Sequence, residues 1–187
     1  MPEQRTVLLL DGHSLAYRAF HALPDTLRTA TGQLTNAVYG FTSMLIKLLE
    51  DRDPDAIVVA FDRGRDVART AVFPEYKANR AAPPEEFRPQ VELIKQVLTA
   101  LDIPIVEVAG VEADDVLATM ATTLVADGAH AYVVTGDRDA MQLADESLTV
   151  LYTLRGITEL AEMTPEAVEE RYGVPPSRYV HLSLIHI

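Results

Sequence analysis

The sequence predicts an α/β protein with a mostly parallel sheet of five strands and helices on both faces. Short runs of aliphatic and β-branched residues alternate along the chain with longer amphipathic segments, which is typical of strands alternating with helices. Such alternation favours a parallel sheet with right-handed crossovers. The 187 residues are enough for one domain with a substantial core.

In the first half, the apolar runs end at acidic residues, and the helices begin at residues suited to helix N-termini. Ser14 and Asn36 are of the types that cap helices through their side chains. The helix after Asn36 has apolar residues at helical spacing. The predicted order is strand 6–10, helix 14–23, loop 24–35, helix 36–51, strand 56–61 and a long loop over 63–84.

The second half continues the alternation. Residues 85–101 are amphipathic, and Thr164 followed by Pro165 is a typical helix start. The predicted order is helix 85–101, strand 103–108, helix 111–127, strand 131–134, short helix 139–144, strand 148–152 and a helix from 164 to 173.

The composition excludes several classes of protein. There is no cysteine, so disulfides and thiolate metal sites are excluded. No run reaches the ~18 apolar residues of a membrane span, and the N-terminus lacks the layout of a signal peptide. We therefore expect a cytoplasmic protein with no membrane partner.

The net charge of −12 argues against a nucleic-acid partner when it is taken alone. However, residues 63–80 hold five basic and two acidic residues, a local charge of +3. In this segment Tyr76 lies among three basic residues, and Lys77 and Arg80 share one face if it is helical. Such residues hold phosphates and stack on unpaired bases, although an ordinary solvated loop is an alternative. The candidates for nucleic-acid contact are Arg69, Tyr76, Lys77 and Arg80.

Carboxylates gather where strands are predicted to end. Each one alone is explained by a helix cap, a favourable helix dipole or a surface ion pair. Together they are not, because ligands of parallel sheets bind at the carboxyl ends of the strands and these acids all fall at that edge. Clustered carboxylates need a cation between them, and hard oxygen ligands suit Mg²⁺ or Mn²⁺. The predicted metal ligands are Asp11, Asp62, Glu112, Asp114, Asp115, Asp137 and Asp139.

The spacing of these acids makes further predictions. Glu112 and Asp115 share a helical face, whereas Asp114 points about 100° away in a regular helix of ~3.6 residues per turn, so that it acts through water or through a distorted first turn. Asp137 and Asp139 face one site only if the chain is extended or turning there. So many acids suit two divalent cations ~4 Å apart, the arrangement that clamps both ends of a phosphodiester displacement.

Five segments closely resemble the N-terminal 5′-to-3′ exonuclease, or flap endonuclease, domain of bacterial DNA polymerase I. The resemblance spans roughly residues 6–180 in unbroken order. Its segments are DGHSLAYRAFHAL (11–23), VAFD (59–62), PEYKANR (74–80), GVEADDVLA (110–118) and TGDRDAMQL (135–143).

The resemblance implies a PIN-like three-layer α/β/α fold and metal-dependent cleavage of DNA bearing a 5′ single-stranded end or flap, and of RNA primers paired with DNA. It implies an arch over residues 63–88, with Lys77 and Arg80 at the scissile phosphate and Tyr76 as a stacking residue. It further implies a monomer, fused to a polymerase in a longer protein. Tyr17, Arg18 and His21 are further candidate substrate contacts.

The C-terminal residues depart from the family pattern. We expect residues 1–180 to form the nuclease domain and 181–187 to be an anomalous tail, with His181 near an expected acid and the DNA-binding helical hairpin missing. On this basis we expect weak or absent cleavage. We also expect metal binding near Asp62, Glu112 and Asp114 to survive better than binding near Asp137 and Asp139.

The sequence is compatible with three alternative functions. A PIN-type ribonuclease shares the acidic fold, and a non-catalytic module that binds branched DNA would bind a flap without cleaving it. A phosphatase with Asp11 as nucleophile is disfavoured, because His13 stands where that chemistry needs an acid.

Overall fold

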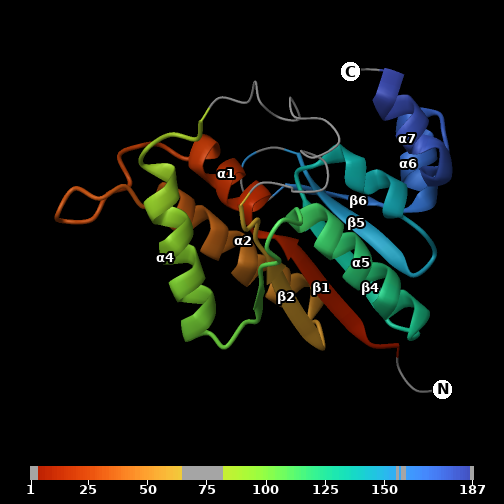
Figure 1. Cartoon of the computed structure of the whole chain (residues 1–187), viewed down its shortest axis with the longest axis horizontal. Helices are drawn as coiled ribbons and strands as arrows, with labels where there is room; N and C mark the ends of the chain where they lie inside the picture. Colours follow the sequence, from red (N-terminus) through yellow and green to blue (C-terminus); the bar gives the residue numbers. More distant parts are fainter. Residues whose placement is uncertain (1–3, 65–81, 155, 157–158, 186–187) are drawn as a thin grey trace.

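The computed structural model describes residues 4–64, 82–154, 156 and 159–185. It contains one six-stranded sheet between two layers of helices (Figure 1), in the order β3-β2-β1-β4-β5-β6. The predicted three-layer α/β/α architecture is confirmed. The strands are β1 (Thr6–Asp11), β2 (Ala56–Ala60), β3 (Ile105–Val106), β4 (His130–Thr135), β5 (Leu148–Thr153) and β6 (Leu160–Met163).

Strand β1 lies at the centre and pairs in parallel with β2 and with β4. Its side chains alternate between two cores because successive residues of a strand point to opposite faces. Leu8 and Leu10 are buried in one core, whereas Val7 and Leu9 are buried in the other. A continuous apolar run is therefore what a strand covered by helices on both faces requires.

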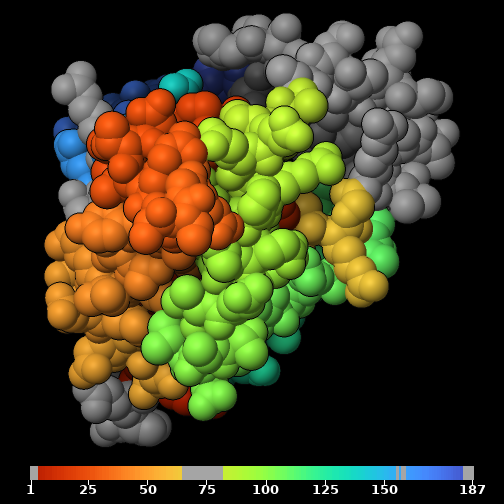
Figure 2. All heavy atoms as spheres, turned by 90° about the vertical axis from the view of Figure 1, so that its left-hand side faces the viewer, coloured from red at the N-terminus to blue at the C-terminus, as the bar shows by residue number. Residues whose placement is uncertain are grey.

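One face of the sheet is covered by α1 (Gly12–Ala22), α2 (Asn36–Arg52) and α4 (Phe87–Ala100). Figure 2 shows α4 packed beside α2 and the loop that precedes it. Buried Gln90 joins the helices, because its Oε1 accepts from the Ala37 N–H at 2.8 Å and its Nε2 donates to Asn36 Oδ1 at 3.1 Å. Asn36 in turn donates to the Phe20 carbonyl at 2.8 Å, so α1 is held in place.

The opposite face is covered by α5 (Ala113–Ala126), the 3₁₀ helix η1 (Arg138–Leu143), α6 (Pro165–Tyr172) and α7 (Pro176–Ile185). Tyr179 of α7 is 5% exposed and packs edge-on against Tyr172. Helix α7 runs through residue 180, and the division of the chain at that residue stays a prediction. Among the described helices, none has the length and apolar character to span a membrane.

The predicted five-stranded sheet is wrong in its strand count. Strand β6 was missed because its four residues, LAEM, show no clear alternation, and it is stabilised by antiparallel pairing with β5. The strand predicted over 103–108 shortens to β3, and the helix predicted over 139–144 is the 3₁₀ helix η1. Helix α7 was not predicted. Most of the predicted loop over 63–84, with Arg69, Tyr76, Lys77 and Arg80, lies outside the described residues.

The strand order creates a switch point beside β1. The chain goes from β1 to β2 and β3 on one side, and β4 and β5 lie on the other. Loops leaving neighbouring strands in opposite directions open a crevice at the carboxyl ends, where ligands of such sheets bind. This crevice contains the predicted acids.

Candidate metal centre

Asp11 ends β1 and caps α1. Its Oδ1 accepts from the Ser14 N–H at 3.0 Å, and its Oδ2 accepts from Thr135 Oγ1 at 2.9 Å. The side chain is buried, with 7% exposed. Burial raises the pKa of the Asp11 carboxyl to about 6; the two hydrogen bonds act against this shift, and nearby Asp62 and Asp114 reinforce it. Asp11 is thus a buried carboxyl whose ionised form needs a compensating cation.

Asp62 lies just beyond β2 and joins it to the start of α5. Its Oδ1 accepts from the Ala113 N–H at 2.7 Å. Its own backbone N–H donates to His13 Nδ1 at 3.1 Å. The His13 ring packs edge-on against Phe61 at 5.4 Å between ring centres, and burial lowers the pKa of His13. His13 therefore holds the backbone that carries the Asp62 carboxylate.

The first turn of α5 presents three acids together. Glu112, Asp114 and Asp115 each offer an oxygen, and these oxygens all lie within 4.8 Å of one another. Glu112 has extended backbone angles, φ −75° and ψ 151°, and the Asp115 N–H donates to Asp114 Oδ1 at 2.8 Å. Of the two predicted arrangements, the Asp114 carboxylate thus lies close enough to join Glu112 and Asp115 directly in this first turn.

The turn between β4 and η1 brings Asp137 and Asp139 together. Asp137 has extended backbone angles, as predicted, and its Oδ1 accepts from the Asp139 N–H at 2.9 Å. The Gly136 N–H donates to Ser14 Oγ at 2.9 Å. A Cβ at Gly136 would lie 2.9 Å from that oxygen, so only glycine fits where this turn approaches α1.

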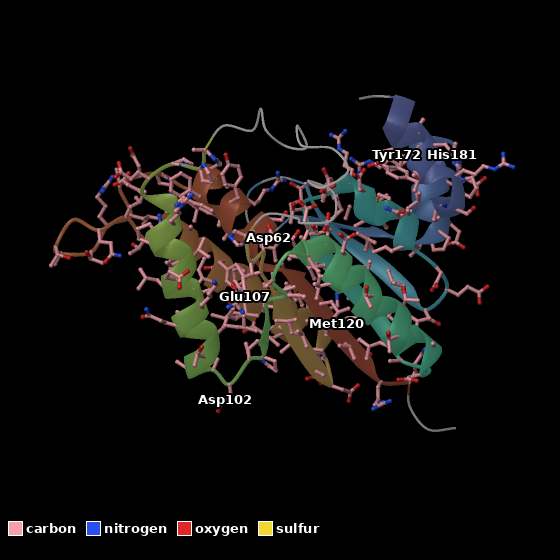
Figure 3. All side chains as sticks on the ribbon, viewed as in Figure 1. Asp62, Asp102, Glu107, Met120, Tyr172 and His181 are labelled. Carbon is pink, nitrogen blue, oxygen red and sulfur yellow. The ribbon has the colours of Figure 1, made fainter. Side chains whose placement is uncertain are left out.

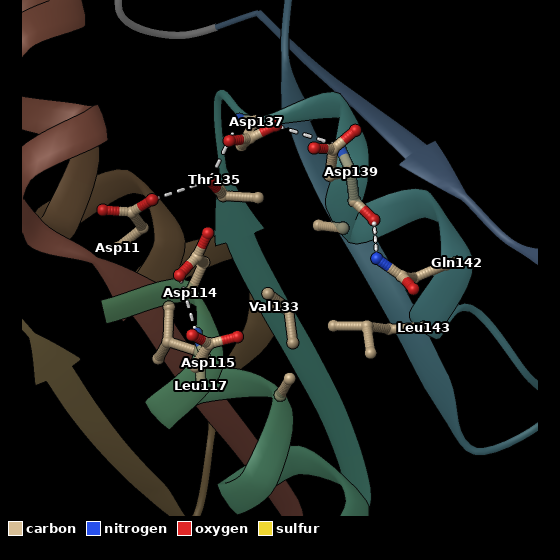
Figure 4. Close-up of a pocket in the computed structure, with 12 residues that line it drawn as sticks. Asp11, Asp114, Asp115, Leu117, Val133, Thr135, Asp137, Asp139, Gln142 and Leu143 are labelled. Atoms are coloured by element: carbon tan, nitrogen blue, oxygen red, sulfur yellow. Dashed lines mark hydrogen bonds between the residues drawn. The ribbon is translucent and has the colours of Figure 1, made fainter. Parts of the chain in front are cut away.

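Two adjoining cavities open between these elements. The smaller, of about 400 Å³, is lined by five of the acids, which Figure 4 shows together with the other lining residues. The larger, of about 720 Å³, forms a groove whose walls include Tyr17 and Phe87. Every acid predicted as a metal ligand lines at least one of them, and three line both: Asp11, Asp114 and Asp137.

The donor set fits a divalent cation. It consists of carboxylate oxygens, which hard cations prefer, and the burial of Asp11 beside other acids disfavours its charged form unless positive charge is supplied. The clustering at the start of α5 gives several oxygens within reach of one ion.

The three candidate substrate contacts on α1 differ in their surroundings. Tyr17 is 45% exposed and lines the groove. His21 packs against Tyr17 with 4.4 Å between ring centres. Arg18 donates to the carbonyls of Thr153 and Leu154 at the end of β5. Of the three, Tyr17 is therefore the residue best placed to meet a substrate, and Arg18 fixes α1 to the sheet.

His13 is a site residue that sequence reasoning missed, because it entered only as the residue that argues against a phosphatase. Its position two residues after the first acid, in the turn that leaves β1, was the available signal. Its contact with the backbone of Asp62 depends on pairing between β1 and β2 and could not be inferred from spacing.

The fold and the acid cluster define the class, an α/β domain of PIN-like fold with a candidate metal site. A family described as "5'-3' exonuclease, N-terminal resolvase-like domain" matches residues 6–173. The chain belongs to this family, which confirms the resemblance seen in the sequence.

Relatives with high identity are bacterial DNA polymerases. The chain is 52% identical to DNA polymerase I of Mycobacterium tuberculosis over 175 residues, which are 93% of this chain and 19% of that protein. It is 43% identical to DNA polymerase I of Bacillus subtilis over 182 residues, or 97% of this chain and 21% of that protein. The chain thus spans about a fifth of the length of these relatives.

Solved structures share the fold. The T5 D15 flap endonuclease, in a pseudo-enzyme-product complex with DNA and metal ions, aligns with a TM-score of 0.72 and 22% identity, covering 94% of this chain and 64% of that one. The catalytic core of Rad2 in complex with DNA substrate aligns with a TM-score of 0.58 and 17% identity, covering 96% of this chain and 54% of that one.

Proposed function

We propose that this chain is a metal-dependent 5′ nuclease domain that hydrolyses phosphodiester bonds at a 5′ single-stranded end or flap of DNA. The observation that carries the proposal is the convergence of all seven predicted acids, from four separate segments, on two adjoining cavities at the carboxyl edge of the sheet. Family membership supports the same activity.

The chain's residues have distinct parts in this proposal. When bound, two divalent cations, Mg²⁺ or Mn²⁺, would supply activation of a water molecule and neutralise charge on the leaving oxygen. Asp62, Glu112, Asp114 and Asp115 would hold one cation. Asp137 and Asp139 would hold the second, and Asp11, which lines both cavities, would be shared by the two.

The substrate would enter the larger groove. Tyr17 at its wall offers an exposed ring on which an unpaired base can stack. Lys77 and Arg80, which lie outside the described residues, are proposed as catalytic contacts to the scissile phosphate. Arg69 and Tyr76, also outside them, are proposed as DNA contacts. The proposal draws support from the complexes of the structural neighbours with DNA.

The biological setting is part of the proposal. Because its relatives are DNA polymerase I proteins of about five times the aligned length, we propose that the domain acts with a polymerase on the same chain. It would remove RNA primers paired with DNA, as well as displaced flaps, as a monomer in the cytoplasm.

A cleavage assay tests the function. The substrate is a DNA duplex with a labelled 5′ flap, incubated with Mg²⁺, with Mn²⁺ or with chelator, and Asp115→Asn is the control variant. We expect short 5′ products that require metal and are lost in the variant. Flap binding without metal-dependent products would instead favour a non-catalytic module that binds branched DNA, and preference for single-stranded RNA would favour a ribonuclease.

A further inference from the structure

Two arginines and two tyrosines meet beside the acidic groove, and we call them the arginine–tyrosine surface: Arg138, Tyr152, Arg171 and Tyr172. Buried Tyr179 packs against Tyr172. Arg138 Nε donates to the Tyr152 hydroxyl at 3.4 Å. The Arg171 guanidinium carbon lies 5.9 Å from the centre of the Tyr152 ring and 5.7 Å from that of Tyr172. Figure 3 shows Tyr172 among the C-terminal helices.

Neither of these two arginines is held in an ion pair within the described part of the chain. Other cations of the chain do have acidic partners, among them Arg28 with Glu86 and Lys47 with Asp51. In a chain with 28 acidic and 16 basic residues, two exposed arginines whose recorded partners are tyrosines require an explanation.

The surface is continuous with the groove. Arg138 and Tyr152 both line the larger cavity, in which Asp11 and Asp62 also lie. The next residue, Asp139, lines the smaller cavity instead. Two consecutive residues of η1 therefore serve different cavities. Arg138 lines the larger groove, and Asp139 lines the smaller cavity.

We propose that Arg138 and Arg171 bind backbone phosphates of the DNA strand where it leaves the acidic groove. This inference rests on the proposed nuclease function and adds a contact surface to it. A guanidinium matches a phosphate with two parallel hydrogen bonds. The tyrosine rings orient Arg171 in advance, and the hydrogen bond to the Tyr152 hydroxyl orients Arg138. Since the net charge repels DNA, local cations must offset that repulsion near the scissile bond.

Acidic residues of α6 limit how far the positive charge of the arginine–tyrosine surface extends. Glu169 and Glu170 directly precede Arg171 and are exposed. The contact therefore involves a few phosphates rather than a broad basic face. It also carries no base-specific group, so it positions the strand without reading its sequence.

Binding of a fluorescent 5′-flap duplex tests the proposal, with Ca²⁺ in place of Mg²⁺ and a series of salt concentrations. The variants are Arg138→Gln, Arg171→Gln and the double substitution. The matched control is Lys47→Gln, which removes the same charge from α2 and lines neither cavity. Thermal melting of each variant checks its folding, and Arg138→Lys, which keeps the charge but loses the planar fork, is the second test.

We expect each single substitution to weaken binding about five-fold and to reduce the salt dependence by about one phosphate contact. The double variant should lose about twenty-five-fold, and Lys47→Gln less than about two-fold. Arg138→Lys should lie between wild type and Arg138→Gln. A folded double variant with wild-type affinity and an unchanged salt slope would overturn the inference while leaving the nuclease proposal intact. Absence of flap binding and cleavage by the wild type would instead overturn the proposed function itself.

Discussion

Two helix starts at the carboxyl edge of the sheet, those of α5 and of η1, use acidic residues in different ways. Asp137 caps η1, because its carboxylate accepts from the Asp139 N–H at 2.9 Å. Glu112 occupies the same position before α5, but within this fully described turn its side chain makes no capping hydrogen bond. Its carboxylate gathers instead with those of Asp114 and Asp115.

The difference shows that helix capping and metal binding are not exclusive explanations of an acid after a strand. At η1 one carboxylate both closes the helix start and lines the cavities, whereas at α5 the backbone starts the helix and the acids lie together. Removing charge at Glu112 should therefore reduce metal binding without the loss of a helix cap, whereas removing the Asp137 side chain at η1 should also lose a cap.

Asp11 also caps a helix, α1, but unlike Asp137 it is buried. The pKa of Asp11 in the folded protein is about 6, above the ordinary value of 3.8. In metal-free protein the Asp11 carboxyl therefore stabilises the fold below about pH 4. This contribution is lost as the pH rises through 6. Metal-free Asp11→Asn should exceed the wild type by on the order of 3 kcal/mol at pH 8 and match it near pH 4, measured by urea unfolding. Equal stability at both pH values would contradict the assigned cause.

Asp114→Asn should lower flap cleavage by about 100-fold, because Asp114 contributes to the clustered oxygens at α5 and lines both cavities. Asparagine preserves the shape and can still accept from the Asp115 N–H. The unfolding free energy should stay within about 0.5 kcal/mol of wild type. Steady-state cleavage and urea unfolding measure the two effects, and a variant that cleaves normally would exclude Asp114 from the site.

His13→Leu should weaken metal binding about ten-fold, because the Asp62 N–H would lose the acceptor that holds it. His13→Asn is the matched rescue, since its side-chain oxygen can take the place of Nδ1. Calorimetric titration with Mn²⁺ gives both affinities. Equal losses in the two variants would mean that packing against Phe61, rather than the hydrogen bond, is what matters.

Asp137→Ala should lower the unfolding free energy by about 1 kcal/mol, because the cap of η1 is lost. Asp137→Asn should keep that stability, since asparagine caps equally well, while still losing cleavage. Glu112→Gln should leave the stability unchanged, since no cap is lost. Chemical unfolding of the three variants measures the contribution of capping separately from metal binding. A large loss of stability in Glu112→Gln would contradict the inference that Asp137 caps its helix and Glu112 does not.

The sequence predicted that these acids share one edge of the sheet, because each follows an apolar run or opens the helix after one, and strand ends in a parallel sheet lie at one edge. Their role as metal ligands stays a prediction. The way in which Asp114 joins Glu112 was not predictable, since it depends on the local geometry of the first turn of α5. The contact of His13 with Asp62 depends on which strands are neighbours.

The arginine–tyrosine surface was also beyond sequence reasoning. Arg138 and Arg171 are 33 positions apart in the printed sequence, and they meet at Tyr152 only because η1, β5 and α6 pack together. Helix α7, whose Tyr179 packs against Tyr172, and strand β6 were not predicted, because neither has a clear periodic pattern.

Anomalous diffraction from crystals of the protein soaked in Mn²⁺ would show whether the acids at the carboxyl edge of the sheet bind divalent cations. We expect a manganese peak among Glu112, Asp114 and Asp115, and a second peak beside Asp137 and Asp139. Crystals that show no peak at these carboxylates under saturating Mn²⁺ would contradict this expectation.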